Sequence, residues 1–118
     1  MKKILVVDDT EFMRLTIKRM LENTSFEVVA EAENGAVAVE KYKVYKPDFV
    51  LMDITMPIMN GLEALKEIKA LNSEAKVVIV SALGQESIVR EAIASGATSF
   101  IVKPFQGEKL VELLMQLG

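Results

Sequence analysis

The chain of 118 residues contains no cysteine, no histidine and no tryptophan. The lack of cysteine excludes a disulfide framework, a thiolate metal site and a cysteine nucleophile. The lack of histidine removes the commonest general base and the commonest ligand of transition metals. Any metal ion in this protein is therefore expected to bind oxygen ligands, which favours a hard cation such as Mg²⁺.

Positive charge and long apolar segments are also scarce. The chain has 14 basic and 17 acidic residues and a net charge of −3, so it lacks the basic field that attracts nucleic acid or an anionic membrane. No apolar run is long enough to span a bilayer, and the initial MKK leads directly into ILVVDD with no signal-peptide pattern. We therefore predict a cytoplasmic protein without nucleic-acid or membrane partners.

The composition is that of a globular protein, with 51% hydrophobic and 26% charged residues. Four short apolar runs, at 4–7, 49–52, 77–80 and 100–102, have the continuous pattern of strands that are buried on both faces of a parallel sheet. A fifth segment, 26–32, is more alternating and is expected nearer an edge of the sheet. Five parallel strands are therefore predicted.

Between these runs, apolar residues recur at spacings of three and four, which predicts amphipathic helices. Asn60-Gly61 suits the start of one helix, and Gly96 suits the end of another. Because strands and helices alternate with short connections, we predict an α/β fold with a central parallel sheet. The predicted helical faces consist of Met13, Ile17, Met20 and Leu21; Leu62, Leu65, Ile68 and Leu71; Ile88, Val89, Ala92 and Ile93; and Leu110, Leu113, Leu114 and Leu117.

Polar residues follow four of the five predicted strands. In an open parallel sheet, ligands bind at the carboxyl ends of the strands, so these residues are expected to meet at one edge. They are Asp8 and Asp9 after the first run, Asp53 after the third, Ser81 after the fourth, and Lys103 with Pro104 after the fifth.

Each of these residues alone has a structural explanation, because aspartate caps helices and turns, and lysine is usually solvated. Three carboxylates at one edge repel one another, however, unless a divalent cation lies among them, and Mg²⁺ suits such a site. With that cation the chemistry of phosphoryl transfer becomes available. One carboxylate would be the nucleophile, while Lys103 and the Ser81 hydroxyl would stabilise the phosphoryl oxygens.

The stretches ILVVDD, LMDITMPIMNG, VVIVSA and FIVKPF, in this order and spacing, resemble the receiver domain of two-component response regulators over the whole chain. The stretches MDITMPIMNG and SALGQESIVREAIASGA are most similar to the chemotaxis members of that family. The resemblance implies a doubly wound, flavodoxin-like (βα)5 fold with the strand order 2-1-3-4-5. It also implies one receiver domain over residues 1–118, with no output domain.

The resemblance further implies a role for each residue around the predicted metal. Asp53 matches the phosphoacceptor, and Asp9 and Asp53 match direct Mg²⁺ ligands. Asp8 matches an acidic residue that acts mainly through water, and the backbone carbonyl of Thr55 matches the third protein ligand. Mg²⁺ is accordingly the expected cofactor.

The remaining matches concern the switch. Ser81 corresponds to the switch hydroxyl, Lys103 to the family's lysine, and Phe100 to the switch aromatic, where the best-known chemotaxis regulators have tyrosine. The Lys103-Pro104 bond resembles the family's cis peptide. The phosphoryl group on Asp53 is expected to draw Ser81 towards it, to let Phe100 rotate, and to remodel the surface of the fourth helix, fifth strand and fifth helix.

The absence of histidine means that the phosphodonor lies in another protein, so the resemblance implies a histidine kinase as a partner. The expected reader of the switch is the flagellar motor switch protein, in chemotaxis, and a phosphatase is a further expected partner. We expect a monomer. An alternative function is that of an intermediate in a phosphorelay, passing its phosphoryl group to a histidine phosphotransferase.

Two other classes of protein share part of this pattern. A phosphatase of the haloacid dehalogenase type also uses Mg²⁺ and an aspartate after a parallel strand, but it needs a second aspartate two residues later, where this chain has Thr55. A flavodoxin-like FMN carrier needs a phosphate loop rich in serine, threonine and glycine after the first strand, where this chain has DDTEFM. We therefore expect a phosphoacceptor that catalyses only its own phosphoryl transfer and dephosphorylation, and not a turnover enzyme.

Overall fold

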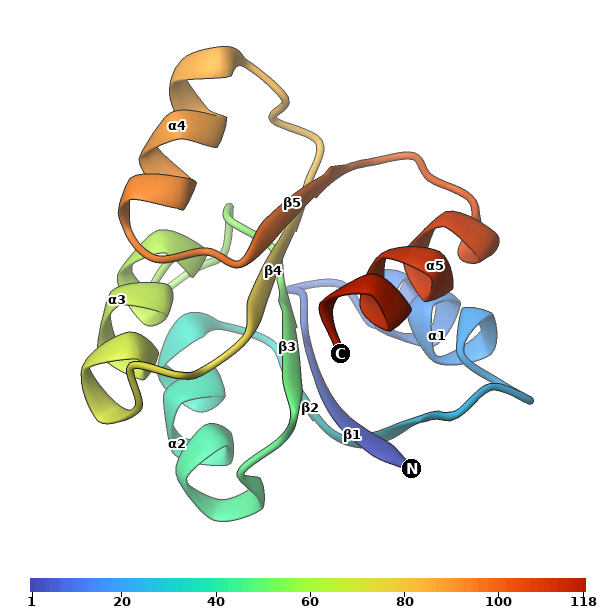
Figure 1. Cartoon of the computed structure of the whole chain (residues 1–118). Helices are drawn as coiled ribbons and strands as arrows, with labels where there is room; N and C mark the ends of the chain where they lie inside the picture. Colours follow the sequence, from blue (N-terminus) through green and yellow to red (C-terminus); the bar gives the residue numbers. More distant parts are fainter.

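The computed structural model describes residues 1–118, along which five strands and five helices alternate (Figure 1). The strands pair in parallel in the order β2-β1-β3-β4-β5, which confirms the doubly wound, flavodoxin-like prediction. The elements are β1 Lys2–Val7, α1 Glu11–Met20, β2 Phe26–Ala32, α2 Gly35–Tyr45, β3 Phe49–Met52, α3 Gly61–Leu71, β4 Val77–Ser81, α4 Glu86–Ala94, β5 Ser99–Val102 and α5 Gly107–Leu117.

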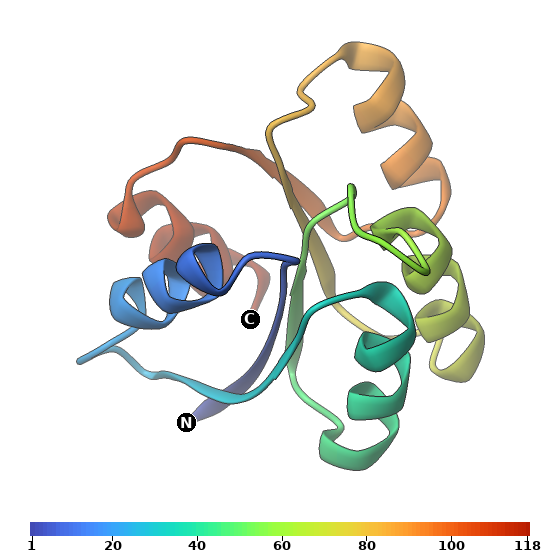
Figure 2. The same cartoon turned by 180° about the vertical axis from the view of Figure 1, so that it is seen from behind.

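Helices cover both faces of the sheet. Figures 1 and 2 show α2, α3 and α4 on one face, and α1 and α5 on the other. Successive side chains of a strand point to opposite faces, so Leu5 and Val7 of β1 pack under the first group of helices, and Ile4 and Val6 pack under the second. This double burial explains why the central strands are continuously apolar.

Both edge strands are less buried than the central ones, but the burial pattern predicted this for only one of them: the apolar run 100–102, expected to be buried on both faces, lies in the edge strand β5. The alternating segment, β2, forms one edge of the sheet beside β1. At the other edge, β5 leaves the side chain of Val102 45% exposed. β1, β3 and β4 lie between them, and their carboxyl ends therefore form the middle of the edge where a ligand would bind.

The helix ends combine predicted and unpredicted features. The side chain of Asn60 caps α3 in a reciprocal pair with Glu63, and Gly96, with φ of 108°, follows the end of α4, so both predicted boundaries are confirmed. Side chains also cap α1, through Thr10, and α2, through Asn34. Helices α4 and α5 begin without a side-chain cap. None of the helices combines the length and apolarity needed to cross a membrane.

Three details differ from the sequence pattern. Helix α2 has no clear apolar stripe, because Val44 and Tyr45 are exposed beside the buried Val39 and Tyr42, and its face could not be predicted. Leu71 and Ile93, predicted on buried faces, are 51% and 48% exposed. Leu71 is the last residue of α3, and α4 covers the edge strand β5, which gives a helix less surface to bury.

Candidate functional site

Three carboxylates meet at the carboxyl edge of the sheet, as predicted. One oxygen atom from each of Asp8, Asp9 and Asp53 lies within 4.8 Å of the others. Val7 pairs with Met52 in the neighbouring strand, which places Asp8 and Asp53, the next residue after each strand, side by side. The backbone N–H of Asp53 donates to the carbonyl of Val7 at 3.0 Å. Segments 44 residues apart in the chain thus form one acidic cluster because β1 and β3 are adjacent.

Asp8 is the most tightly held of the three. Its Oδ1 accepts hydrogen bonds from the backbone N–H of Thr10, at 3.0 Å, and from the Thr10 hydroxyl, at 3.1 Å. Its Oδ2 accepts from the Lys103 ammonium at 2.8 Å. Asp8 is only 2% exposed, so its charge is buried but paired.

Asp53 is buried with fewer partners. Its Oδ1 accepts from the backbone N–H of Ile54 at 2.8 Å, and its Oδ2 lies 3.6 Å from the Lys103 ammonium. Burial raises the pKa of this carboxyl above its ordinary value; Lys103 partly opposes that shift, and the nearby charge of Asp8 adds to it. A single ammonium therefore serves two carboxylates, and it is closer to Asp8 than to the predicted phosphoacceptor.

The donor atoms of this cluster fit a hard divalent cation. All three groups offer carboxylate oxygens, Asp8 and Asp53 are buried, and Asp9 is exposed, which leaves a solvent side for water ligands. Three carboxylates and one nearby lysine leave a local charge of −2, which a divalent cation would neutralise. Thr55, whose carbonyl is the further predicted ligand, lies two residues beyond Asp53 in the β3–α3 loop and is itself exposed.

The two predicted switch residues lie on one face of neighbouring strands. Ser81 ends β4, is 1% exposed, and its Oγ accepts the backbone N–H of Leu83 at 3.0 Å. Phe100, on β5, pairs with Ile79, and its half-buried ring packs into the core on the α4 side. Because Ile79 and Ser81 are two residues apart, Ser81 and Phe100 face the same layer.

Lys103 follows β5 and is placed by the backbone as well as by its ion pairs. Its N–H donates to the carbonyl of Ser81 at 2.9 Å, and the Lys103–Pro104 peptide bond is cis, as the resemblance implies. Every strand-end residue predicted from the sequence thus lies at this edge of the sheet. Asp8, Asp53 and Lys103 are in direct contact, whereas the Ser81 hydroxyl is bonded within its own loop.

Three further residues support the site and were not identified from the sequence. Thr10 fixes Asp8 while capping α1, and its place between a strand and a helical pattern was a usable signal. Arg14 donates to the carbonyl of Asp8 at 2.7 Å and to Glu31 at 3.1 Å. A Cβ atom on Gly61 would lie 1.9 Å from the carbonyl oxygen of Asp53, so only glycine fits there. No local pattern reveals either of these last two contacts.

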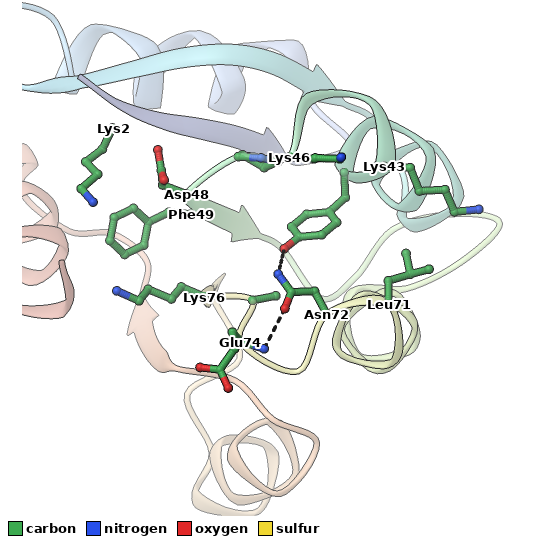
Figure 3. A pocket seen from close by; sticks show the side chains of 12 residues that line it. Lys2, Lys43, Lys46, Asp48, Phe49, Leu71, Asn72, Glu74 and Lys76 are labelled. Carbon is green, nitrogen blue, oxygen red and sulfur yellow. Dashed lines mark hydrogen bonds between the residues drawn. The ribbon is translucent and has the colours of Figure 1, made fainter.

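A pocket of about 550 Å³ lies at the opposite, amino-terminal edge of the sheet (Figure 3). Lysines line much of it, and one of them, Lys76, donates to the carbonyl of Leu117 at 2.9 Å with its ammonium 5.5 Å from the centre of the Phe49 ring. Lys43 and Lys46 lie at the C-terminal end of α2, where cations offset the helix dipole. Because these lysines have structural roles, we do not assign the functional site to this pocket.

Comparisons with known proteins identify the family of this chain. A family model described as the response regulator receiver domain matches residues 4–115. The chain is 57% identical over 112 residues to the chemotaxis protein CheY of Bacillus subtilis, covering 95% of this chain and 93% of that protein. It is 53% identical over 117 residues to the chemotaxis protein CheY of Thermotoga maritima, covering 99% and 98%.

A solved structure has nearly the same fold. It is a chain in the crystal structure of the CheX-CheY-BeF3-Mg²⁺ complex from Borrelia burgdorferi, with a TM-score of 0.95 and 35% identity, covering 98% of this chain and 88% of that chain. The acidic cluster, the fold and the sequence matches lead to one conclusion. This chain belongs to the response regulator receiver family, and it resembles the chemotaxis proteins named CheY over nearly its whole length.

Proposed function

We propose that this protein is a cytoplasmic switch in which Asp53 accepts a phosphoryl group from a histidine kinase in a Mg²⁺-dependent reaction. The observation that carries the proposal is the buried Asp53 carboxylate beside one ammonium, from Lys103, and two further carboxylates. Such a group is poised for nucleophilic attack only when the charges around it are neutralised. A structural ion pair would not need the exposed third carboxylate of Asp9.

The chain's own groups have distinct parts in the proposed reaction. A carboxylate oxygen of Asp53 attacks phosphorus, the bond from phosphorus to the donor's nitrogen breaks, and an acyl phosphate forms. Lys103 stabilises the negative charge of the phosphoryl oxygens, and the Ile54 N–H helps to hold the carboxylate in place. Mg²⁺, held by Asp8, Asp9 and Asp53 with the Thr55 carbonyl, would supply further neutralisation of that charge.

The signal is proposed to leave the site through Ser81. At present its hydroxyl accepts the N–H of Leu83, so turning towards a phosphoryl oxygen would give up that bond and shift the β4–α4 loop. Space opened there would admit Phe100 from the same layer. The absence of side-chain caps on α4 and α5, and the exposure of Ile93 and Val102, support the α4–β5–α5 surface as the part that a partner reads.

The relatives favour chemotaxis as the setting. The two relatives compared above are both chemotaxis proteins named CheY, and a related CheY was crystallised with CheX, BeF3 and Mg²⁺. We propose the flagellar motor switch protein as the partner that binds the phosphorylated form, and a phosphatase as a further partner. The protein itself is proposed to be a monomer that catalyses only its own phosphoryl transfer and dephosphorylation. Binding of the phosphorylated protein to a motor-switch peptide, compared with transfer of its phosphoryl group to a histidine phosphotransferase, separates chemotaxis from a phosphorelay.

Intact mass spectrometry after incubation with Mg²⁺ and a small phosphodonor tests the proposal directly. One labile phosphoryl mass is expected on the wild-type protein and none on Asp53→Ala, because the nucleophile is then absent. No addition to the wild type would contradict the proposed function. Addition to both proteins would show that a different residue accepts the group.

The acidic cluster also has an expected effect on stability. Without metal the Asp53 carboxylate is buried among like charges, so Asp53→Asn is expected to raise the free energy of unfolding by about 1 kcal/mol, or roughly 3–5 °C in melting temperature. Because the folded-state pKa of Asp53 is raised, this gain should be full at neutral pH and vanish below the ordinary carboxyl pKa.

Mg²⁺ should raise the free energy of unfolding of the wild type, and should raise that of Asp53→Asn much less, because one ligand carboxylate is then missing. At about 100 times its Kd a native-state ligand adds about 2.7 kcal/mol. Thermal unfolding of both proteins with and without Mg²⁺, at pH 7 and pH 3, measures these effects. Melting curves that respond neither to Mg²⁺ nor to the substitution would rule out a clustered cation site.

A further inference from the structure

Helix α2 has an outer surface that stays exposed although much of it is apolar. Val44 is 73% exposed and Tyr45 is 42% exposed. Figures 1 and 2 show α2 at the end of the layer that it forms with α3 and α4, so no further helix of the chain covers this side. The surface, called the α2 face below, is a shallow hollow of about 450 Å³ lined by Ala36, Val37, Glu40, Lys41, Val44 and Tyr45.

The opposite side of α2 packs into the core. Ala38, Val39 and Tyr42 are buried there, among residues of the sheet and of α3. Both sides of the helix are therefore apolar, which is why no single apolar stripe marks it. A helix that is apolar all round is normally covered all round, so the α2 face is expected to have a partner outside its own chain.

The residues of the α2 face have a symmetrical order. The centre of symmetry lies midway between positions 40 and 41. Three pairs stand at equal distances on either side of it: Ala36 and Tyr45, Val37 and Val44, and Glu40 and Lys41. In two antiparallel copies of α2 related by a two-fold axis, each residue lies opposite the other member of its pair. Apolar side chains then meet apolar side chains, and a carboxylate meets an ammonium at two equivalent places.

The charges of the α2 face are free to make these contacts. Lys41 has no ion pair within its own chain. Glu40 pairs only with Lys43, at 3.3 Å, and both side chains are exposed, so this pair contributes little and is easily exchanged. Antiparallel helices also place opposite ends of their dipoles side by side. A second copy thus satisfies both charges while it covers Val44.

We propose that the α2 face binds the α2 face of a second copy of this chain, as an antiparallel helix pair with two-fold symmetry. One helix from each copy buries less than the roughly 1,000 Å² of a stable interface, so the contact is weak, with a Kd between about 0.1 and 1 mM. The dilute protein remains the monomer proposed above, and pairs form where copies are concentrated. This inference does not depend on phosphorylation, because the α2 face contains no residue of the acidic cluster.

Sedimentation equilibrium between about 10 µM and 1 mM tests the pairing. The wild type is expected to self-associate over this range. Glu40→Lys should weaken association about tenfold or more, because two like-charged contacts replace two ion pairs. Val44→Asn should weaken it similarly, since the apolar contact across the axis is lost. Glu22→Lys, an exposed charge reversal after α1 on the other side of the sheet, is the matched control and should associate as the wild type does.

A charge swap distinguishes the antiparallel pair from general electrostatic effects. Glu40→Lys brings the net charge closer to zero, so weaker overall repulsion would predict more association and not less. Lys41→Glu alone should also weaken association. A mixture of these two variants should associate as the wild type does, because lysines in one copy then face glutamates in the other. The double variant should recover as well.

Unchanged melting temperatures would show that the variants are folded, as expected for substitutions at exposed positions. A wild type that stays monomeric up to about 1 mM would overturn the proposal, as would association that Glu40→Lys leaves unchanged. Association that both single variants lose but the mixture does not recover would exclude the antiparallel pairing. Loss of association in Val102→Asn alone would assign the contact to the α4–β5–α5 surface instead.

Discussion

Replacing Lys103 with methionine is expected to slow phosphoryl transfer to Asp53 from a small phosphodonor by about 100-fold or more. The Lys103 ammonium is the one cationic group within 4 Å of the carboxylate oxygens of the cluster, at 2.8 Å from Asp8 and 3.6 Å from Asp53. Arg14, the nearest alternative, is bonded to a backbone carbonyl and to Glu31. No other side chain is therefore placed to stabilise the phosphoryl oxygens.

The same substitution should affect stability, with a sign that depends on Mg²⁺. Asp8 would lose its only ion pair while remaining buried, and an unpaired buried carboxylate destabilises a fold. We expect a lower melting temperature without metal and its recovery when Mg²⁺ restores positive charge to the site. This response distinguishes loss of charge from general damage.

Time-resolved intact mass spectrometry with phosphoramidate and saturating Mg²⁺ measures the rate. Lys109→Met, on the exposed side of α5, is the matched control and should behave as the wild type. A rate for Lys103→Met within about threefold of the wild type would show that the metal alone neutralises the phosphoryl group, and it would remove Lys103 from the proposed mechanism.

Gly61→Ala is expected to destabilise the protein by at least about 3 kcal/mol, the largest effect expected for alanine at any glycine of this chain. The new Cβ would lie 1.9 Å from the carbonyl oxygen and 2.9 Å from the carbonyl carbon of Asp53. Those atoms are backbone, so no side-chain rotation relieves the overlap. Either α3 or the end of β3 has to move.

Movement of β3 would also misplace the phosphoacceptor. The N–H of Gly61 donates to the carbonyl of Ile54, so the start of α3 is attached to the residue after Asp53. We therefore expect any Gly61→Ala protein that remains folded to accept a phosphoryl group more slowly than wild type. This second effect follows from the same contact.

Urea unfolding of wild type, Gly61→Ala and Gly107→Ala measures the effect. Gly107, the first residue of α5, is the control, because a Cβ there would come no closer than 3.1 Å to the Met20 side chain, an overlap that a shift of a few tenths of an ångström relieves. Its change in the free energy of unfolding should be under about 1 kcal/mol. An equally small change for Gly61→Ala would show that the loop beside Asp53 yields readily.

Much of the fold was predictable because the strands of a buried parallel sheet have a recognisable hydrophobic pattern in the sequence. Strands buried on both faces are continuously apolar, as at 4–7 and 49–52, and those two segments are adjacent in the structure. Helix α2 was the exception, since exposed Val44 and Tyr45 obscure its buried face. Periodicity identifies a helix only where one side of it is polar.

The sequence by itself determined which residues gather at the functional edge, because the carboxyl ends of parallel strands all lie there and the residue after each strand can be read directly. Only the tertiary structure decided how they pair. Lys103 and Asp8 are 95 residues apart, and their contact depends on the strand order and register. The same holds for the fit of Gly61 against Asp53 and for the exposure of Val44, since close approach and burial are properties of the packed chain and not of any local segment.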